Sequence, residues 1–257
     1  SARSDIVFID PIIGVGELAI SDHRSSQPTL DEFLRVASEA HVAGLMTGKA
    51  GILHIHMGDG KRGLELVREA LDTSEIPARV FNPTHINRNK TLFDEALPLS
   101  LRGVRLDVTA FPEGHSAPGW SAAEAFLRYR DGGYPADKLT ISSDGGGCLP
   151  HFNEEGELTR MGVGHSSTLI EALREILNHE VPHSSQVPHV SITEALSPFT
   201  SNVADLLKLS HKGRLQQGKD ADMVVLDKDY NICDVMARGR WHKRHGKTQI
   251  FGTYEQS

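Results

Sequence analysis

Two histidines lie one residue apart in the stretch GILHIHMG, residues 51–58. If this apolar stretch forms a strand, His54 and His56 point to the same face, because successive side chains of a strand alternate between its two faces. Neutral imidazole is a common zinc ligand, so the pair is a candidate metal site. The alternative is a pair of buried, hydrogen-bonded core histidines.

Three further residues that can bind a metal lie at or near the ends of strand-like segments. Glu17 belongs to GVGELAI, His85 ends RVFNPTH, and Asp144 follows LTISS. In a parallel barrel the C-terminal ends of all strands meet at one rim, where active sites are built. We therefore expect Glu17, His56, His85 and Asp144 to converge, although each alone has an ordinary structural explanation.

Strand-like segments alternate with amphipathic helical segments over about the first two thirds of the chain. This alternation indicates an α/β fold with βα units around a parallel sheet. The candidate strands cover residues 14–20, 51–57, 79–85, 103–109 and 139–144.

Helix starts are marked by three capping-box spacings, which are Thr29 with Glu32, Ser121 with Glu124, and Ser191 with Glu194. We expect Gly44 and Gly132 to follow the last turns of the first two helices. Pro198 is expected to divide the third region into two short helices.

The pattern of predicted secondary structure changes near residue 211. Short β segments, clearest at 222–226 and 231–239, alternate there with glycine-containing and charged turns. We expect two units, an α/β unit over residues 1–210 and a β unit over residues 211–257.

Composition excludes several classes of protein. The 257 residues are 39% hydrophobic and 24% charged, and no apolar run approaches the ~20 residues that span a bilayer. The net charge of −7 gives no general attraction to nucleic acid, and the basic run 238–247 is interpreted as a solvated strand and turn. Two cysteines make no disulfide framework and the first ten residues lack a secretory signal, so we expect a cytoplasmic protein.

Four stretches, AISDHRSS, HMGDGK, PTHINRN and SSDGGG, resemble those of the β-aspartyl (isoaspartyl) dipeptidases of the amidohydrolase superfamily. The later GRLQQGKDADMVVLD resembles the C-terminal β-sandwich segment of that superfamily. The resemblance runs along almost the whole chain. It implies a (β/α)8 TIM barrel of the amidohydrolase type, of which strands four to eight are present, over residues 1–210, and part of a small β-sandwich over residues 211–257.

The resemblance also implies roles for single residues. His56 and His85 match metal ligands, and Asp144 matches an aspartate that binds metal and acts as general base. Arg24 and Arg88 match arginines that hold substrate carboxylates. The implied reaction is hydrolysis of β-aspartyl dipeptides by a metal-activated water with two zinc ions, although the same ligands accept manganese, cobalt or nickel.

The superfamily's own H-x-H pair belongs to the first barrel strand. Only His56 of the present pair therefore matches a ligand, and His54 is expected to be an interior packing or second-layer residue.

Three departures from the family stand out. Glu17 occupies the position of a carboxylated lysine that bridges two metals, and it offers the same terminal carboxylate on a shorter side chain. Cys148 occupies the position of a substrate-binding serine; we favour a near-isosteric replacement over a metal-attracting or buried cysteine. Nothing matches the family's first half with its H-x-H pair, so we expect the chain to need that N-terminal part.

Two alternatives remain open. One is another amidohydrolase, such as a cyclic-amide hydrolase or an N-acyl amino-acid deacylase, which the two arginines disfavour. The other is a non-catalytic fragment that serves in assembly or binding. A homo-oligomer is expected only by inheritance from the family.

Overall fold

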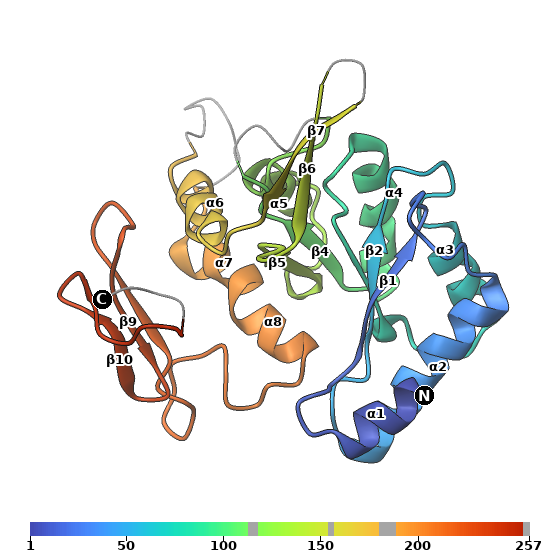
Figure 1. Cartoon of the computed structure of the whole chain (residues 1–257), viewed down its shortest axis with the longest axis horizontal. Helices are drawn as coiled ribbons and strands as arrows, with labels where there is room; N and C mark the ends of the chain where they lie inside the picture. Colours follow the sequence, from blue (N-terminus) through green and yellow to red (C-terminus); the bar gives the residue numbers. More distant parts are fainter. Residues whose placement is uncertain (113–117, 154–156, 180–188, 254–257) are drawn as a thin grey trace.

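The computed structural model describes residues 1–257 except 113–117, 154–156, 180–188 and 254–257. The fold contains five parallel strands, which follow one another along the chain (Figure 1). They are β1 (Val15–Ile20), β2 (Leu53–Met57), β3 (Phe81–Thr84), β4 (Leu106–Thr109) and β5 (Leu139–Ser142). Ladders join β1, β2 and β3, and a second ladder joins β4 to β5. The backbone N–H of Ile86 donates to the Asp107 carbonyl at 3.3 Å and links the two sets. The expected parallel βα units are confirmed.

Helices connect these strands, namely α2 (Leu30–Thr47), α3 (Glu65–Thr73), α4 (Lys90–Leu101) and α5 (Ala122–Asp131), and α6 (Thr168–Leu177) follows β5. Both halves of the capping box form at Thr29 with Glu32 and at Ser121 with Glu124, as predicted. These boxes satisfy backbone N–H groups that the first helical turn leaves without partners.

Both predicted helix ends are wrong by one or more residues. Helix α2 passes through Gly44 and ends at Gly48, whose φ of +77° suits glycine. Gly44 is there for packing, because a Cβ on it would lie 2.7 Å from the Cα of Gly51. Helix α5 has Gly132 as a right-handed C-cap, and the left-handed residue is Gly133.

The region around Pro198 divides as expected. Helix α7 (Ile192–Leu196) is capped by the Ser191 side chain, a 3-10 turn η3 (Ser197–Phe199) contains the proline, and α8 (Ser201–Leu206) follows. At the other end of the chain, the short helix α1 (Ala2–Phe8) buries Ile6 against α2. Two further 3-10 turns, η1 (Ala78–Val80) and η2 (Ala136–Lys138), precede β3 and β5.

Two antiparallel sheets complete the described chain. The hairpin of β6 (Cys148–Phe152) and β7 (Leu158–Val163) projects from the top of Figure 1. The other sheet has the order β11-β10-β9-β8 and comprises β8 (Met223–Leu226), β9 (Ile232–Ala237), β10 (Arg240–Arg244) and β11 (Lys247–Thr248). The basic run 238–247 is thus a strand and turn, as predicted. Arg174 of α6 donates to the Tyr230 carbonyl at 3.1 Å and ties this sheet to the α/β part; the division at residue 211 stays a prediction.

The main core fills the space between the parallel strands and their helices. Phe33 of α2 stacks on Phe81 of β3 with ring centroids 5.6 Å apart, and both are fully buried. Alternate residues of β2, Leu53, Ile55 and Met57, point into the same core. Full burial of each such side chain contributes about 1.5–3 kcal/mol, so the helix-covered face of the sheet is firmly fixed.

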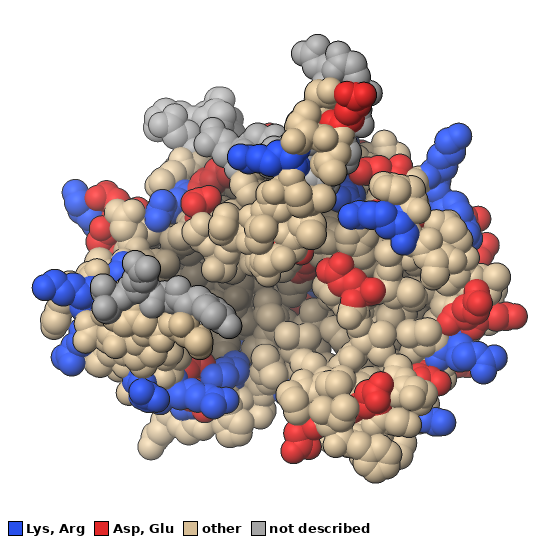
Figure 2. Space-filling model, in the orientation of Figure 1, with Lys and Arg blue, Asp and Glu red and all other residues tan. Residues whose placement is uncertain are grey.

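The opposite face of the strands is open. Within the described residues β1 pairs only with β2 and β5 only with β4. A cavity of about 700 Å³ lies between β1, β5 and α8, with His54, Asn82 and Asp107 among its polar lining. Figure 2 shows this face hollowed near its middle, with acidic and basic side chains intermingled around it. No helix among the described residues has both the length and the apolar character to cross a bilayer.

Candidate active site

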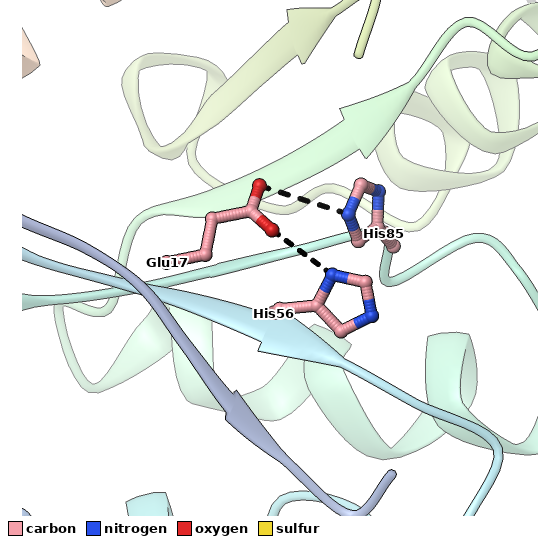
Figure 3. Close-up of side chains that lie close together, drawn as sticks. All are labelled: Glu17, His56 and His85. Atoms are coloured by element: carbon pink, nitrogen blue, oxygen red, sulfur yellow. Dashed lines mark hydrogen bonds and ion pairs between the residues drawn. The ribbon is translucent and has the colours of Figure 1, made fainter. Parts of the chain in front are cut away.

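Glu17 on β1, His56 on β2 and His85 directly after β3 form a compact group. Nδ1 of His56 lies 3.0 Å from Oε2 of Glu17, and Nε2 of His85 lies 3.9 Å from Oε1 (Figure 3). One potential ligand atom from each residue lies within 4.8 Å of the others. The structure therefore brings together three of the four predicted metal-binding residues.

A bulge in β1 places Glu17. Val15 pairs with Leu53 and Leu18 with Ile55, so β1 advances by three residues where β2 advances by two. Glu17 thus lies within β1 rather than at its end, two residues before Ala19, the pairing partner of His56. Because residues two apart share a face of a strand, Glu17 and His56 project to the same side.

His85 is buried, and its imidazole contacts the side chain of Thr109 at the end of β4. It directly follows β3, has φ of +61°, and is 2% exposed. Its Nδ1 lies 2.7 Å from Oγ1 of Thr109, and Asn87 in turn bonds the Thr109 backbone N–H and carbonyl. Burial, followed by the charges of His56 and Arg88, lowers the pKa of His85 to about 3. The contact of Nδ1 with Thr109 leaves Nε2 turned toward Glu17.

His56 is held by charged groups instead. Its Nε2 lies 3.1 Å from Nη2 of Arg24, 3.3 Å from Nη1 of Arg88 and 3.3 Å from Oδ2 of Asp22. Arg88 also donates to the Met57 carbonyl. Both predicted carboxylate-binding arginines therefore lie beside one imidazole of the metal group.

The group suits a divalent cation. The hydrogen bond with His56 outweighs the opposing effect of burial, so the pKa of Glu17 is lowered and its carboxylate form is favoured. Two imidazole nitrogens with a carboxylate form a common zinc ligand set, and manganese, cobalt or nickel accept the same donors.

Asp144 faces the same site but stands outside the group of three. It lies two residues beyond β5 with φ of +48°, and a Cβ on Gly147 would come within 2.3 Å of its Oδ1. Burial and the charge of Glu17 raise its pKa, whereas His56 and Arg88 lower it. Its two predicted roles, ligand and general base, stay predictions.

Two other predicted residues lie at the mouth of the site. The side chain of Arg24 is 51% exposed, and its pKa is raised first by the hydrogen bonds to Asp22, and then by the charges of Asp22, Asp59 and Cys148, against a lowering by burial. Cys148 is exposed at the start of β6. Their roles in binding substrate, like that of Arg88, stay predictions.

His54 lies beside the metal group. Its Nδ1 lies 2.7 Å from Oδ1 of Asn82, and its Nε2 lies 3.7 Å from Oε1 of Glu17. Its imidazole therefore comes as near to the Glu17 carboxylate as that of His85 does, and its expected role as an interior residue that does not bind metal stays a prediction.

Sequence reasoning missed two carboxylates. Asp22 lies between Arg24 and His56, and its only sequence signal was its place in the AISDHRSS stretch. Asp107 is buried in β4, where it accepts hydrogen bonds from the hydroxyls of Thr84, Thr140 and Ser142, each at 2.6 Å. Those donors come from β3 and β5, on either side of β4, so no local sequence pattern predicts the contacts.

Comparison with known proteins agrees with this geometry. Residues 14–242 match the model of the Amidohydrolase family. The crystal structure of a beta-aspartyl dipeptidase from Fervidobacterium islandicum AW-1, in complex with a beta-Asp-Leu dipeptide, is 36% identical with a TM-score of 0.86 over 98% of this chain and 62% of that one. A second structure of that organism's dipeptidase is 34% identical with a TM-score of 0.82 over 98% and 61%.

A more distant match comes from the N-acetylglucosamine-6-phosphate deacetylase of Lysinibacillus sphaericus. It is 30% identical over 99 residues, which are 38% of this chain and 24% of the deacetylase. The present chain thus spans about three fifths of the length of the dipeptidase structures and a quarter of the deacetylase.

Proposed function

This chain belongs to the amidohydrolase family, and we propose that it carries the catalytic residues of a zinc-dependent isoaspartyl dipeptidase. The observation that supports this most is the placement of Arg24 and Arg88 beside His56, within the group formed with Glu17 and His85. A β-aspartyl dipeptide carries two free carboxylates. A guanidinium group can bind a carboxylate through two parallel hydrogen bonds, in a bidentate manner. Two arginines at a metal site therefore suit a substrate with two carboxylates.

The proposed chemistry divides between a cation and the chain. A divalent cation held by Glu17, His56 and His85 would polarise the scissile amide and lower the pKa of a water molecule. Arg24 and Arg88 orient the dipeptide through its carboxylates. The carboxylate of Asp144 accepts the proton of the attacking water and passes it to the leaving amine.

Glu17 is proposed to bridge two metal ions in place of a carboxylated lysine. Its Oε2 faces His56, and its Oε1 faces His85 and His54. A carboxylate with histidines near both oxygens would be able to hold two cations.

The activity is proposed to belong to a longer polypeptide. The dipeptidase structures extend well beyond the length that this chain matches. Within the described residues β1 and β5 each keep one edge unpaired, where further strands would add. Those strands would supply the superfamily's H-x-H pair and close the barrel.

The deciding experiment is a substrate comparison with the full-length protein. β-Asp-Leu should be hydrolysed, α-Asp-Leu should be hydrolysed at least 100-fold more slowly, since its carboxylates are differently spaced, and a chelator should abolish the activity. N-acetylglucosamine 6-phosphate tests the deacetylase that matches over 99 residues. Faster release of acetate than of leucine would overturn the proposal in favour of a deacetylase.

A further inference from the structure

Asp22 is a buried carboxylate that touches two parts of the site at once. Its side chain is 5% exposed. Oδ1 accepts from the backbone N–H of Arg24 at 2.7 Å and from Nε at 3.0 Å, and Oδ2 accepts from Nη2 at 2.8 Å. The same Oδ2 lies 3.3 Å from Nε2 of His56. A third neighbour, the 88% exposed His23, has its Nδ1 3.7 Å from Oδ1.

The backbone around Asp22 is fixed as well. Its carbonyl accepts from the N–H of Ser25 at 3.1 Å and from the side chain of Gln27 at 2.7 Å. Gly58 packs so closely that a Cβ there would lie 2.4 Å from the Cβ of Asp22. These contacts fix the backbone of Asp22, and its hydrogen bonds to Arg24 hold the carboxylate.

The contacts of His56 fit two tautomers differently. With the proton on Nδ1, that atom donates to Glu17, and Nε2 accepts from Arg24 or Arg88. With the proton on Nε2, the lone pair of Nδ1 is free for a metal. Arginine has no acceptor atom, so of the three groups around Nε2 only Asp22 can then receive the hydrogen bond.

We propose that Asp22 is a positioning residue that stabilises the metal-binding tautomer of His56 and, through the same carboxylate, aims the guanidinium of Arg24 at the substrate. This inference rests on the proposed function for the role of Arg24, and only on the metal group for the role of His56. A carboxylate behind a ligating histidine fixes its ring and raises its basicity, and loss of such a partner typically costs 10–100-fold in metal affinity.

Asp22→Asn in the full-length protein tests the first role. Asparagine keeps the shape, but its amide can donate to Nε2 and so favours the wrong tautomer. Zn²⁺ affinity, measured by competition with a chelator, should fall about 10–100-fold. The matched control is Asp59→Asn: Asp59 lies 3.6 Å from Nε of Arg88, is 67% exposed, and has no contact with a histidine among the described residues. The Zn²⁺ affinity of the Asp59→Asn variant should stay within about threefold of wild type.

Imidazole ¹⁵N NMR of the zinc-loaded wild type provides a readout that needs no variant to fold. His56 should carry its proton on Nε2 and bind zinc through Nδ1. A His56 protonated on Nδ1, or equal zinc affinities for wild type and Asp22→Asn, would overturn the proposal.

The role of Asp22 toward Arg24 is tested by measuring KM and kcat of Asp22→Asn at saturating zinc. Asp22→Asn should raise KM for β-Asp-Leu about tenfold or more, with a smaller change in kcat, because Arg24 loses its anchor. An unchanged KM would remove the Arg24 role. If wild type fails to hydrolyse β-Asp-Leu, the proposed function falls, whereas the zinc affinity and NMR measurements still decide the role of Asp22 toward His56.

Discussion

Two buried carboxylates of the site are surrounded by opposite kinds of neighbours. At the rim, which comprises Asp22, Arg24, His56 and Arg88, Arg24 lowers the pKa of Asp22 by hydrogen bonds and charge. At the floor, which comprises Asp107, Thr84, Thr140 and Ser142, neutral hydroxyls surround Asp107 and burial raises its pKa. One side-chain type is thus held in two electrostatic environments within a single site.

The difference separates chemistry from structure. The rim contains the Asp22–Arg24 ion pair, and the side chain of Arg24 is half-exposed, so substitutions at the rim should change metal binding and turnover. Floor groups tie β3, β4 and β5 together through Asp107, so their substitution should change stability first. The predictions below test this division.

The largest effect is expected at the two histidines. In the full-length protein, His56→Ala and His85→Ala should each remove one metal equivalent and most activity, because no neighbour replaces the lost imidazole. Metal analysis of purified protein checks this. Two equivalents retained per site in either variant would show that the altered histidine is not a ligand.

Asp144→Asn should have the next largest effect. General-base catalysis typically contributes ~10²–10⁴-fold, so kcat should fall by that factor while KM changes little. Steady-state kinetics with β-Asp-Leu provides the measurement. A variant within about threefold of wild type would assign the proton transfer to another group.

At the floor, Asp107→Ala should destabilise the fold by about 3 kcal/mol, because two buried hydroxyls and the partly buried hydroxyl of Ser142 lose their acceptor. Urea denaturation measures this loss. The control is Asp94→Ala on α4, an exposed carboxylate expected to change stability by less than about 0.5 kcal/mol. Equal effects of the two variants would contradict the structural role of the floor.

The floor should also show its own pH dependence. An acid with a raised pKa in the folded state binds more protons folded than unfolded, so its contribution is full below the ordinary value of 3.8 and is lost as pH rises through the folded pKa. Asp107→Asn does not titrate there. The free energy of unfolding of Asp107→Asn relative to that of wild type should therefore increase as the pH rises above the ordinary Asp value of 3.8, and a constant difference would argue against the raised pKa.

The smallest effect is expected from bicarbonate. If Glu17 bridges the metals itself, reconstitution of metal-free protein should not depend on bicarbonate, whereas Glu17→Lys should become dependent because a carbamate must form. Lys49 is no substitute, since its Nζ donates to the Ile6 and Ile9 carbonyls at 2.6 and 2.9 Å. Bicarbonate dependence of the wild type would rule out the bridging role. Normal metal content and rate in Glu17→Gln would show that Glu17 is an ordinary strand carboxylate.

Local chemistry made much of the fold predictable. The capping boxes at Thr29 and Ser121 depend on residues three apart, so the sequence contains the whole interaction. The five parallel strands followed from alternation of apolar segments with helices. The position of Glu17, His56, His85 and Asp144 at or near the ends of parallel strands predicted their convergence, and the structure groups the first three.

Features that depend on contact between distant segments were not predictable. Gly44 was assigned to a helix end, because nothing nearby reveals that Gly51 packs against it. Glu17 reaches His56 only through a bulge between β1 and β2.

The sequence by itself determined which side chains are available for catalysis and on which elements they lie, because periodicity and capping act over a few residues. Only the tertiary structure decided what each charged group faces. Asp22 and Asp107 are both aspartates and differ only in their neighbours. Asp22 contacts a guanidinium and an imidazole, whereas Asp107 accepts from three hydroxyls on neighbouring strands. Hydrogen bonds and burial across the fold therefore set their ionisation, since both depend on residues far away in the chain.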